Sequence, residues 1–266
     1  MSLTNMLSLI RNENMKIYRR ISTWVLLGIL ITFVTIFGVA LKVNTPEGIT
    51  MWTFIEESSG LTAIITLFTV IIAGGIVATE FTQGTIKLLL IRPVSRTKIL
   101  LSKYLSTMFF ALTTLMQLFV TAFLLGGLLF GFESFTDPYI APESTVEKSM
   151  LGHVLSLYGL NFVDVVMMST FAFMISTVFR SSSLSIGLAI FLMFAGTTAV
   201  MLLIGIGYEE WAKYLLFANT DLSQHINNRP LIEGTTMRFS ISVLIVYFAS
   251  FVGLSWVVFN KRDVAA

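Results

Sequence analysis

Residues 22–41, STWVLLGILITFVTIFGVAL, form a stretch of 20 residues without a single charge. A helix needs about 20 apolar residues to cross the hydrocarbon core of a bilayer. Outward from this stretch, five more apolar runs follow, and a helix is the expected form of each because a lone strand leaves backbone polar groups unpaired in lipid. The sequence therefore predicts an all-α integral membrane protein. Its six predicted spans are residues 22–41, 60–79, 105–131, 156–179, 184–207 and 239–259.

Composition supports this class. Hydrophobic residues make up 55% of the 266 residues and charged residues only 12%, whereas a soluble domain carries about 25% charged residues. The mean hydropathy is +0.85. No Pro-rich, Gly-rich or polar linker interrupts the chain, so residues 1–266 are expected to form a single transmembrane domain.

The charges predict which side each loop occupies. Twelve Lys and Arg residues lie in the N-terminal segment, the second and fourth connections and the C-terminus, against five in the other three connections. Eleven of the 15 acidic residues lie in those three. Basic residues accumulate on the cytoplasmic side of membrane proteins. We therefore expect the chain to span a bacterial cell membrane with both termini in the cytoplasm.

Several chemistries are excluded by residues that the chain lacks. It has no cysteine, and its two histidines, His153 and His225, are far apart in sequence. It contains no GxxxxGK[ST] phosphate loop, no HExxH and no GxSxG. We therefore expect no enzyme activity, no metal site and no cofactor bound by this chain, and each histidine is expected to be an ordinary interfacial residue.

Residues 1–20 have the pattern of an amphipathic helix on the membrane surface, with basic side chains near anionic headgroups. Such a helix could be a plain anchor for the first span or could have a mechanical role. Its predicted apolar face comprises Leu3, Met6, Leu7, Ile10, Ile17 and Ile21, and the opposite face carries Asn5, Asn12, Lys16 and Arg19.

The connection between the second and third spans reads EFTQGTIKLLLIRPVSRTKILLSKY, residues 80–104. Its run IKLLLI, residues 86–91, is too short to span a membrane and needs a cover, either the headgroup zone, the helical bundle or another protein. Pro93 ends a helix, Ser95 can cap the next, and residues 97–104 lead into the third span. The expected shape is a short helix, a turn and a second helix; an interfacial turn is the simpler interpretation.

Asp164 is the ionisable residue placed clearly within a predicted span. Such residues usually face a cavity or a partner, although Asp164 could also lie near the outer end of its span, wetted or bonded to Asn161. The pairs Gly74-Gly75 and Gly126-Gly127 allow close helix approach or bending. In the connection 208–238, residues 209–217 could form a short helix, and re-entry into the membrane stays open.

Residues 13–24, ENMKIYRRISTW, and the connection 80–104 together resemble the permease subunits of bacterial ATP-binding-cassette exporters of the type-2 class. The connection has that family's acid, Gly-Thr, short apolar helix, Pro and Ser-Arg. Six spans with no nucleotide-binding domain also fit, while the second half of the chain is similar only in its hydrophobic layout.

The resemblance implies that two such subunits, identical or paralogous, pair in lipid, and that separate ATPase subunits using ATP and Mg²⁺ dock on the cytoplasmic side. It implies export, often for multidrug or antimicrobial peptide resistance, and no nucleic-acid partner. Glu80 matches the family at the base of the second span. The implied docking residues, forming a coupling helix, are Gly84, Thr85, Ile86, Lys87, Leu88, Leu89, Leu90 and Arg92.

A stand-alone carrier or channel is the alternative. It would need polar groups inside the spans, and Asp164 is nearly alone there. A membrane enzyme would need a nucleophile, base or metal-ligand set that the sequence does not offer. The transported substrate cannot be deduced from these residues.

Overall fold

The apolar stretches are long helices in the computed structural model, which describes residues 3–44, 48–86, 94–135, 138–139, 148–226 and 230–261. Within these ranges six helical segments are long and apolar enough to cross a membrane, which confirms the predicted number of candidate spans. The segments are α2 (Ile21–Asn44), the run Met51–Thr82, α7 (Arg96–Phe130), α8 (Met150–Val178), α9 (Ser182–Gly205) and α12 (Met237–Lys261).

The second segment is a chain of short helices rather than one rod. It starts at Met51, earlier than predicted. Acidic residues follow Trp52 and Phe54 in the sequence, but both of these side chains are fully buried in the bundle. It breaks at Val77, where Ser176 Oγ of α8 accepts hydrogen bonds from the backbone N–H groups of Val77 (3.1 Å) and Ala78 (3.0 Å). Its parts are α3 (Met51–Ser58), η1 (Ser59–Leu61), α4 (Thr62–Ile76) and α5 (Ala78–Thr82).

The third segment also begins before the predicted boundary. Helix α7 starts at Arg96, so Lys103 lies inside a helix. Its assignment to the basic connection had placed it in a loop. Ser95 occupies the N-cap position with an extended backbone, as expected, but its side chain makes no capping hydrogen bond. Beyond α7, β1 (Pro138–Tyr139) and β2 (Lys148–Ser149) form a two-residue antiparallel ladder.

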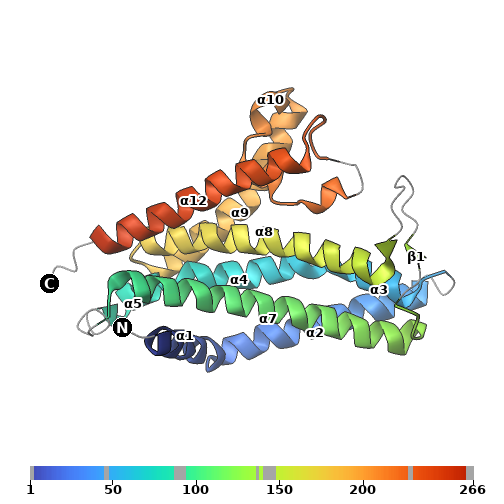
Figure 1. Cartoon of the computed structure of the whole chain (residues 1–266), viewed down its shortest axis with the longest axis horizontal. Helices are drawn as coiled ribbons and strands as arrows, with labels where there is room; N and C mark the ends of the chain where they lie inside the picture. The colour runs from blue at the N-terminus through green and yellow to red at the C-terminus, as the bar shows by residue number, and fades with distance from the viewer. Residues whose placement is uncertain are drawn as a thin grey trace.

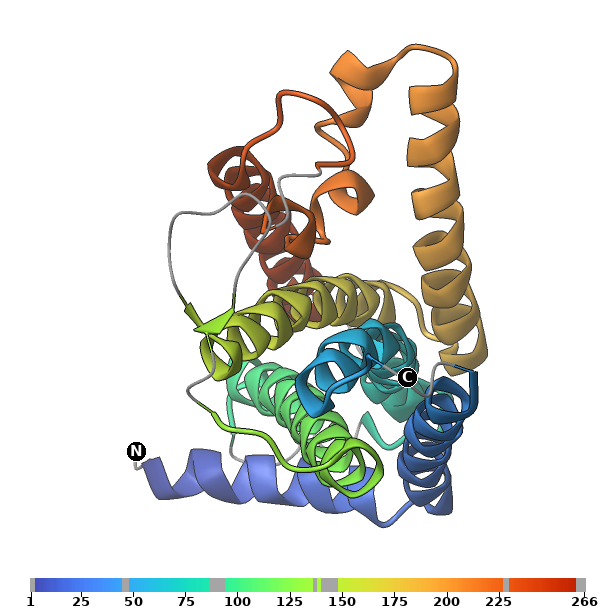
Figure 2. The same ribbon diagram turned by 90° about the vertical axis from the view of Figure 1, so that its right-hand side faces the viewer.

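The helices α2, α4, α7 and α8 run along the long axis of the molecule (Figure 1). Helix α1 (Leu3–Tyr18) lies across this bundle: it is seen along its full length in Figure 2, where α2 and α7 are viewed nearly end-on. Helix α9 also departs from the bundle axis, and α10 (Glu209–Ala212) sits near its far end.

The core fills the space between α2, α3, α4, α7 and α8, around Trp52, Phe54, Phe110 and Leu118. Two large side chains in it have partners for their polar atoms: Trp52 Nε1 donates to the Ser134 carbonyl at 3.0 Å, and the Tyr158 hydroxyl donates to the Ile55 carbonyl at 3.1 Å. By contrast, large apolar side chains of α2, α9 and α12 face outward, as lipid-facing helices require.

Close helix approach at the paired glycines is confirmed. A Cβ atom on Gly74 would lie 3.3 Å from Ile186 Cα of α9, and one on Gly75 would lie 3.2 Å from Ile186 Cδ1. At the second pair, a Cβ on Gly126 would lie 3.1 Å from side-chain atoms of Met51 and Phe54. The absence of side chains at these glycines therefore allows two close contacts between helices of the bundle.

The connection between α9 and α12 folds back against the spans. In place of one helix over residues 209–217 it forms α10, α11 (Leu216–Asn219) and η2 (Ser223–His225). The Phe217 ring lies 6.1 Å from that of Phe171, which is past the midpoint of α8. Part of the connection thus lies deep along the spanning helices, a point that the sequence left open.

Candidate functional site

Four charged side chains meet where α1, α5 and α7 converge. Lys103 Nζ lies 2.8 Å from Glu13 Oε2 and 2.8 Å from Glu80 Oε1. Lys16 Nζ lies 2.8 Å from Glu13 Oε1 and 2.8 Å from the same Glu80 oxygen. We call Glu13, Lys16, Glu80 and Lys103 the charge cluster. Its two ammonium groups and two carboxylates balance.

Burial makes this pairing obligatory. The Lys103 side chain is 1% exposed, and those of Glu13 and Glu80 are 8% and 10% exposed. Taking an ion out of water costs several kcal/mol unless an opposite charge and hydrogen bonds compensate. Lys103 is therefore tolerated inside the protein because carboxylates from α1 and α5 both reach it, and it binds these two helices to α7.

Lys16 closes the cluster on its exposed side. Burial by itself would lower the pKa of Lys16, but hydrogen bonds to the Glu13 and Glu80 carboxylates outweigh it and raise the pKa. Lys16 is therefore charged at neutral pH. Its ammonium group is turned toward the two acids, and the expected nearness of the basic side of this helix to anionic headgroups stays a prediction.

Helix α1 lies against the first half of α7. Ile17, one turn after Glu13, is buried, while Leu7, expected on the same apolar face, is 66% exposed. Ser106 Oγ of α7 donates to the Ile10 carbonyl at 3.2 Å. The face of α1 that meets the bundle is therefore centred on Glu13 and Ile17, and it is not the purely apolar stripe drawn from the sequence.

The same cluster borders the start of the segment expected to dock an ATPase. The Thr85 hydroxyl donates to the Glu80 carboxylate in a short hydrogen bond. Gly84 has a positive φ of 70°, which favours glycine because it lacks a Cβ, and Ile86 is buried. Of the expected docking residues, Lys87, Leu88, Leu89, Leu90 and Arg92 lie outside the described residues.

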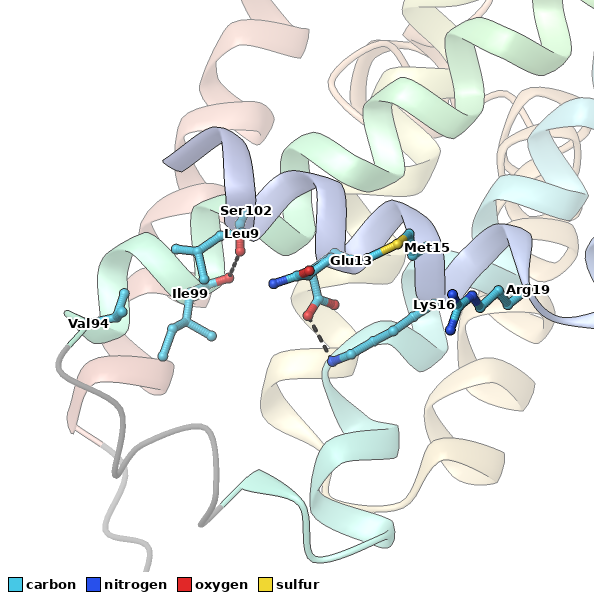
Figure 3. A pocket seen from close by; sticks show the side chains of 9 residues that line it. Leu9, Glu13, Met15, Lys16, Arg19, Val94, Ile99 and Ser102 are labelled. Carbon is cyan, nitrogen blue, oxygen red and sulfur yellow. Dashed lines mark hydrogen bonds and ion pairs between the residues drawn. The ribbon is translucent and has the colours of Figure 1, made fainter. Parts of the chain in front are cut away.

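Two cavities adjoin the charge cluster. Figure 3 shows the first, of about 310 Å³, between α1 and the start of α7, with Glu13 and Lys16 on its α1 side. The second, of about 470 Å³, is lined by Glu80, Lys103 and Thr85 among others. The charge cluster thus borders two cavities.

Asp164 occupies a separate place, in a cavity of about 560 Å³. Its Oδ2 accepts a hydrogen bond from Thr66 Oγ1 of α4 at 3.1 Å. Asn161, the alternative partner considered for Asp164, donates from Nδ2 to the Ser59 carbonyl at 3.4 Å, and the place of Asp164 near the outer end of its span stays a prediction. Asp221 of the folded-back connection lines the same cavity and acts on Asp164 electrostatically.

The family model described as "Protein of unknown function (DUF2705)" matches residues 8–265. The chain belongs to this family. It is similar to the "Uncharacterized protein YhcI" of Bacillus subtilis (strain 168), at 38% identity over 98% of this chain and 100% of the relative. It is also similar to the "Uncharacterized membrane protein YdbK" of the same strain, at 33% identity over 79% of this chain and 82% of the relative. With six candidate spans, this DUF2705 chain is a multi-pass membrane protein.

Neither histidine of the DUF2705 chain lines the Asp164 cavity or belongs to the charge cluster, although His225 is close to Asp221 of that cavity. His153 Nε2 lies 3.1 Å from Glu56 Oε1, and His225 Nε2 lies 3.0 Å from Ser240 Oγ. Partial burial lowers the pKa of His225 despite the nearby charge of Asp221. Among the described residues no group of three or more His, Cys, Asp or Glu side chains could hold a metal ion.

Sequence reasoning on this DUF2705 chain singled out Glu80 but missed its partners Glu13, Lys16 and Lys103. A usable signal existed. Few acids lie on the predicted cytoplasmic side, and Glu13 and Glu80 are two of them. Acids that are rare in a basic environment are candidates for ion pairs, but their partners come from helices that only the fold brings together.

Proposed function

We propose that this chain is the membrane-spanning subunit of an ATP-driven exporter, coupled to a separate ATPase subunit that docks on residues 84–92. The observation that carries the proposal is the charge cluster. It fixes the end of α5 and the start of α7, the two described flanks of that segment, to each other and to α1. A docking element needs such a rigid base if force applied to it is to reach the spans.

The local contacts support a mechanical connection from residues 84–92 to the spanning helices. Glu80 accepts from Lys16, Lys103 and Thr85, so the residue that begins the connection is held from three directions. A displacement of residues 84–92 would therefore move α5, α7 and α1 together. Because α5 is separated from α4 only by the break at Val77, and Ser176 of α8 holds that break, the movement would reach α4 and α8 as well.

The assembly completes the proposal. The chain carries no nucleotide-binding motif, so ATP and Mg²⁺ would be used by the partner. Two six-span subunits, identical or paralogous, would enclose the pathway in the bilayer. Both termini and residues 84–92 would face the cytoplasm, as the distribution of basic residues favours. Resistance to drugs or antimicrobial peptides is the proposed physiological context.

The test is co-purification of the tagged chain from its native membrane in mild detergent, with Leu89→Asp as the variant. We expect a Walker-motif ATPase to copurify with the unchanged chain. The variant should release most of it, because a charge in an apolar contact loses its hydration without gaining a partner.

Tyr208→Asp is the matched control, because Tyr208 is exposed and lies in a connection predicted to face the other side. It should retain the ATPase. Equal retention of the ATPase by Leu89→Asp and the unchanged chain would refute docking at this segment.

The carrier or channel alternative is favoured by one observation, the cavity that holds Asp164 and Asp221. A carrier would move its substrate in liposomes that contain this chain alone under an ion gradient. Transport that appears without any ATPase would replace the exporter proposal by this alternative.

A further inference from the structure

The cavity that contains Asp164 is built from segments far apart in the sequence. Its wall includes Ser59 of η1, Thr62 at the start of α4, Asp164 of α8, Met201 of α9 and Asp221 of the folded-back connection. Its volume of about 560 Å³ falls in the range of small-molecule sites, about 300–1,000 Å³.

Among its described lining residues, the charge of this cavity is unbalanced. Asp164 and Asp221 both line it, and no lysine, arginine or histidine is among its described lining residues. Their described hydrogen-bond donors are neutral: the Thr66 and Thr220 hydroxyls for Asp164, and the backbone N–H (2.9 Å) and hydroxyl (2.5 Å) of Ser223 for Asp221. This differs from the charge cluster, where every acid has an ammonium partner. Acids facing the same hollow within a membrane protein favour a cation between them.

A second observation points to a missing ligand. Thr62 lines the cavity and is 5% exposed, and its Oγ1 has no hydrogen-bond partner among the described residues. A buried hydroxyl without a partner is unfavourable, because it has lost its hydrogen bonds to water and gained none in the protein. A ligand with a polar group in the cavity would remove this cost.

The remaining wall is apolar and indicates the rest of the ligand. Leu157, Met201, Phe217 and Leu231 supply aliphatic and aromatic surface. Aromatic faces attract organic cations. A bare divalent metal ion would leave this surface unused, and the two carboxylates belong to no group of three or more His, Cys, Asp or Glu side chains among the described residues that could hold a metal ion.

We propose that this cavity binds a lipophilic monovalent organic cation, with its charge between Asp164 and Asp221 and its apolar body against Phe217, Met201 and the two leucines. As a binding site this stands on the cavity alone. As the transported substrate class, it rests on the exporter function proposed above.

The test uses radiolabelled tetraphenylphosphonium and the purified chain in lipid nanodiscs, with no ATPase present. Tetraphenylborate, of nearly the same shape and opposite charge, is the matched competitor. We expect saturable binding that unlabelled tetraphenylphosphonium displaces and tetraphenylborate does not. Asp164→Asn and Asp221→Asn should each weaken binding by about tenfold or more, whereas Glu233→Gln, an exposed acid of the same connection, should leave it unchanged.

Binding that is unsaturable, or equal for both probes, would overturn the proposal, as would displacement by millimolar Mg²⁺ or Ca²⁺, which would indicate a metal site. The probe pair needs no variant, so the proposal stays testable if Asp164→Asn does not fold. Because no ATPase takes part, a negative result here leaves the docking proposal intact, and loss of ATPase docking leaves this site intact.

Discussion

At the scale of single residues, Lys103 is the most consequential side chain of the described structure. It is almost fully buried and bridges acids from two other helices. Removing one member of a buried ion pair is costly mainly because the remaining charges stay behind without compensation. In this chain two carboxylates would remain, with only the half-exposed Lys16 between them.

Lys103→Met keeps the length and the apolar stem of the side chain but removes its charge. We expect it to lower the free energy of unfolding by about 3–5 kcal/mol, because Glu13 and Glu80 lose their buried partner. The measurement is the midpoint of thermal unfolding in detergent, followed by intrinsic tryptophan fluorescence.

Lys261→Met is the control, since Lys261 is exposed at the end of α12. A midpoint for Lys103→Met as high as that of the control would mean that the cluster contributes nothing to stability. Adding Glu13→Gln to Lys103→Met should cost less than the sum of the two single changes, because the residues share one network.

At the scale of helices, the contact of α4 with α9 depends on the absence of side chains. Gly74 and Gly75 allow Ile186 to approach within about van der Waals distance of the α4 backbone. In membranes, helix association relies on such close packing because lipid offers no hydrophobic driving force between helices. The glycine pair therefore determines how closely α9 packs against α4.

Gly74→Val should push α4 and α9 apart, since its Cβ would lie 3.3 Å from a backbone atom of Ile186 that cannot rotate away. Overpacking of this kind costs about 1–3 kcal/mol. Gly28→Val is the matched control, because a Cβ on Gly28 of α2 has no neighbour within 4 Å. Equal unfolding midpoints for the two valine variants would contradict the proposed role of the contact.

At the scale of the whole molecule, the orientation in the membrane can be tested directly because the chain has no cysteine. We expect a membrane-impermeant maleimide to label Glu209→Cys in intact cells and to spare Asn12→Cys and Arg180→Cys until the cells are opened. All three positions are exposed. Labelling of Asn12→Cys in intact cells would reverse the topology that the basic residues predict.

The two candidate places lie in different parts of this whole. The charge cluster joins α1, α5 and α7 beside residues 84–86, while the Asp164 cavity lies between α4, α8, α9 and the folded-back connection. Helix α4 connects them, since it leads into α5 through the break at Val77 and also carries Thr62 and Thr66. Helix α8 is a second connection, since it carries both Ser176, which holds that break, and Asp164.

The six candidate spans and the helical class could be predicted from the amino-acid sequence, because crossing a bilayer depends on a local property, an uninterrupted apolar length whose helix satisfies its own hydrogen bonds. The sequence also marked Glu80, Asp164 and the glycine pairs as unusual. Their partners were decided only by the tertiary structure. Glu13 meets Lys103 across 90 residues of chain, and Asp164 meets Asp221 because the last connection folds back along the spans. Such contacts depend on how helices pack against one another, and no local pattern of residues encodes that arrangement.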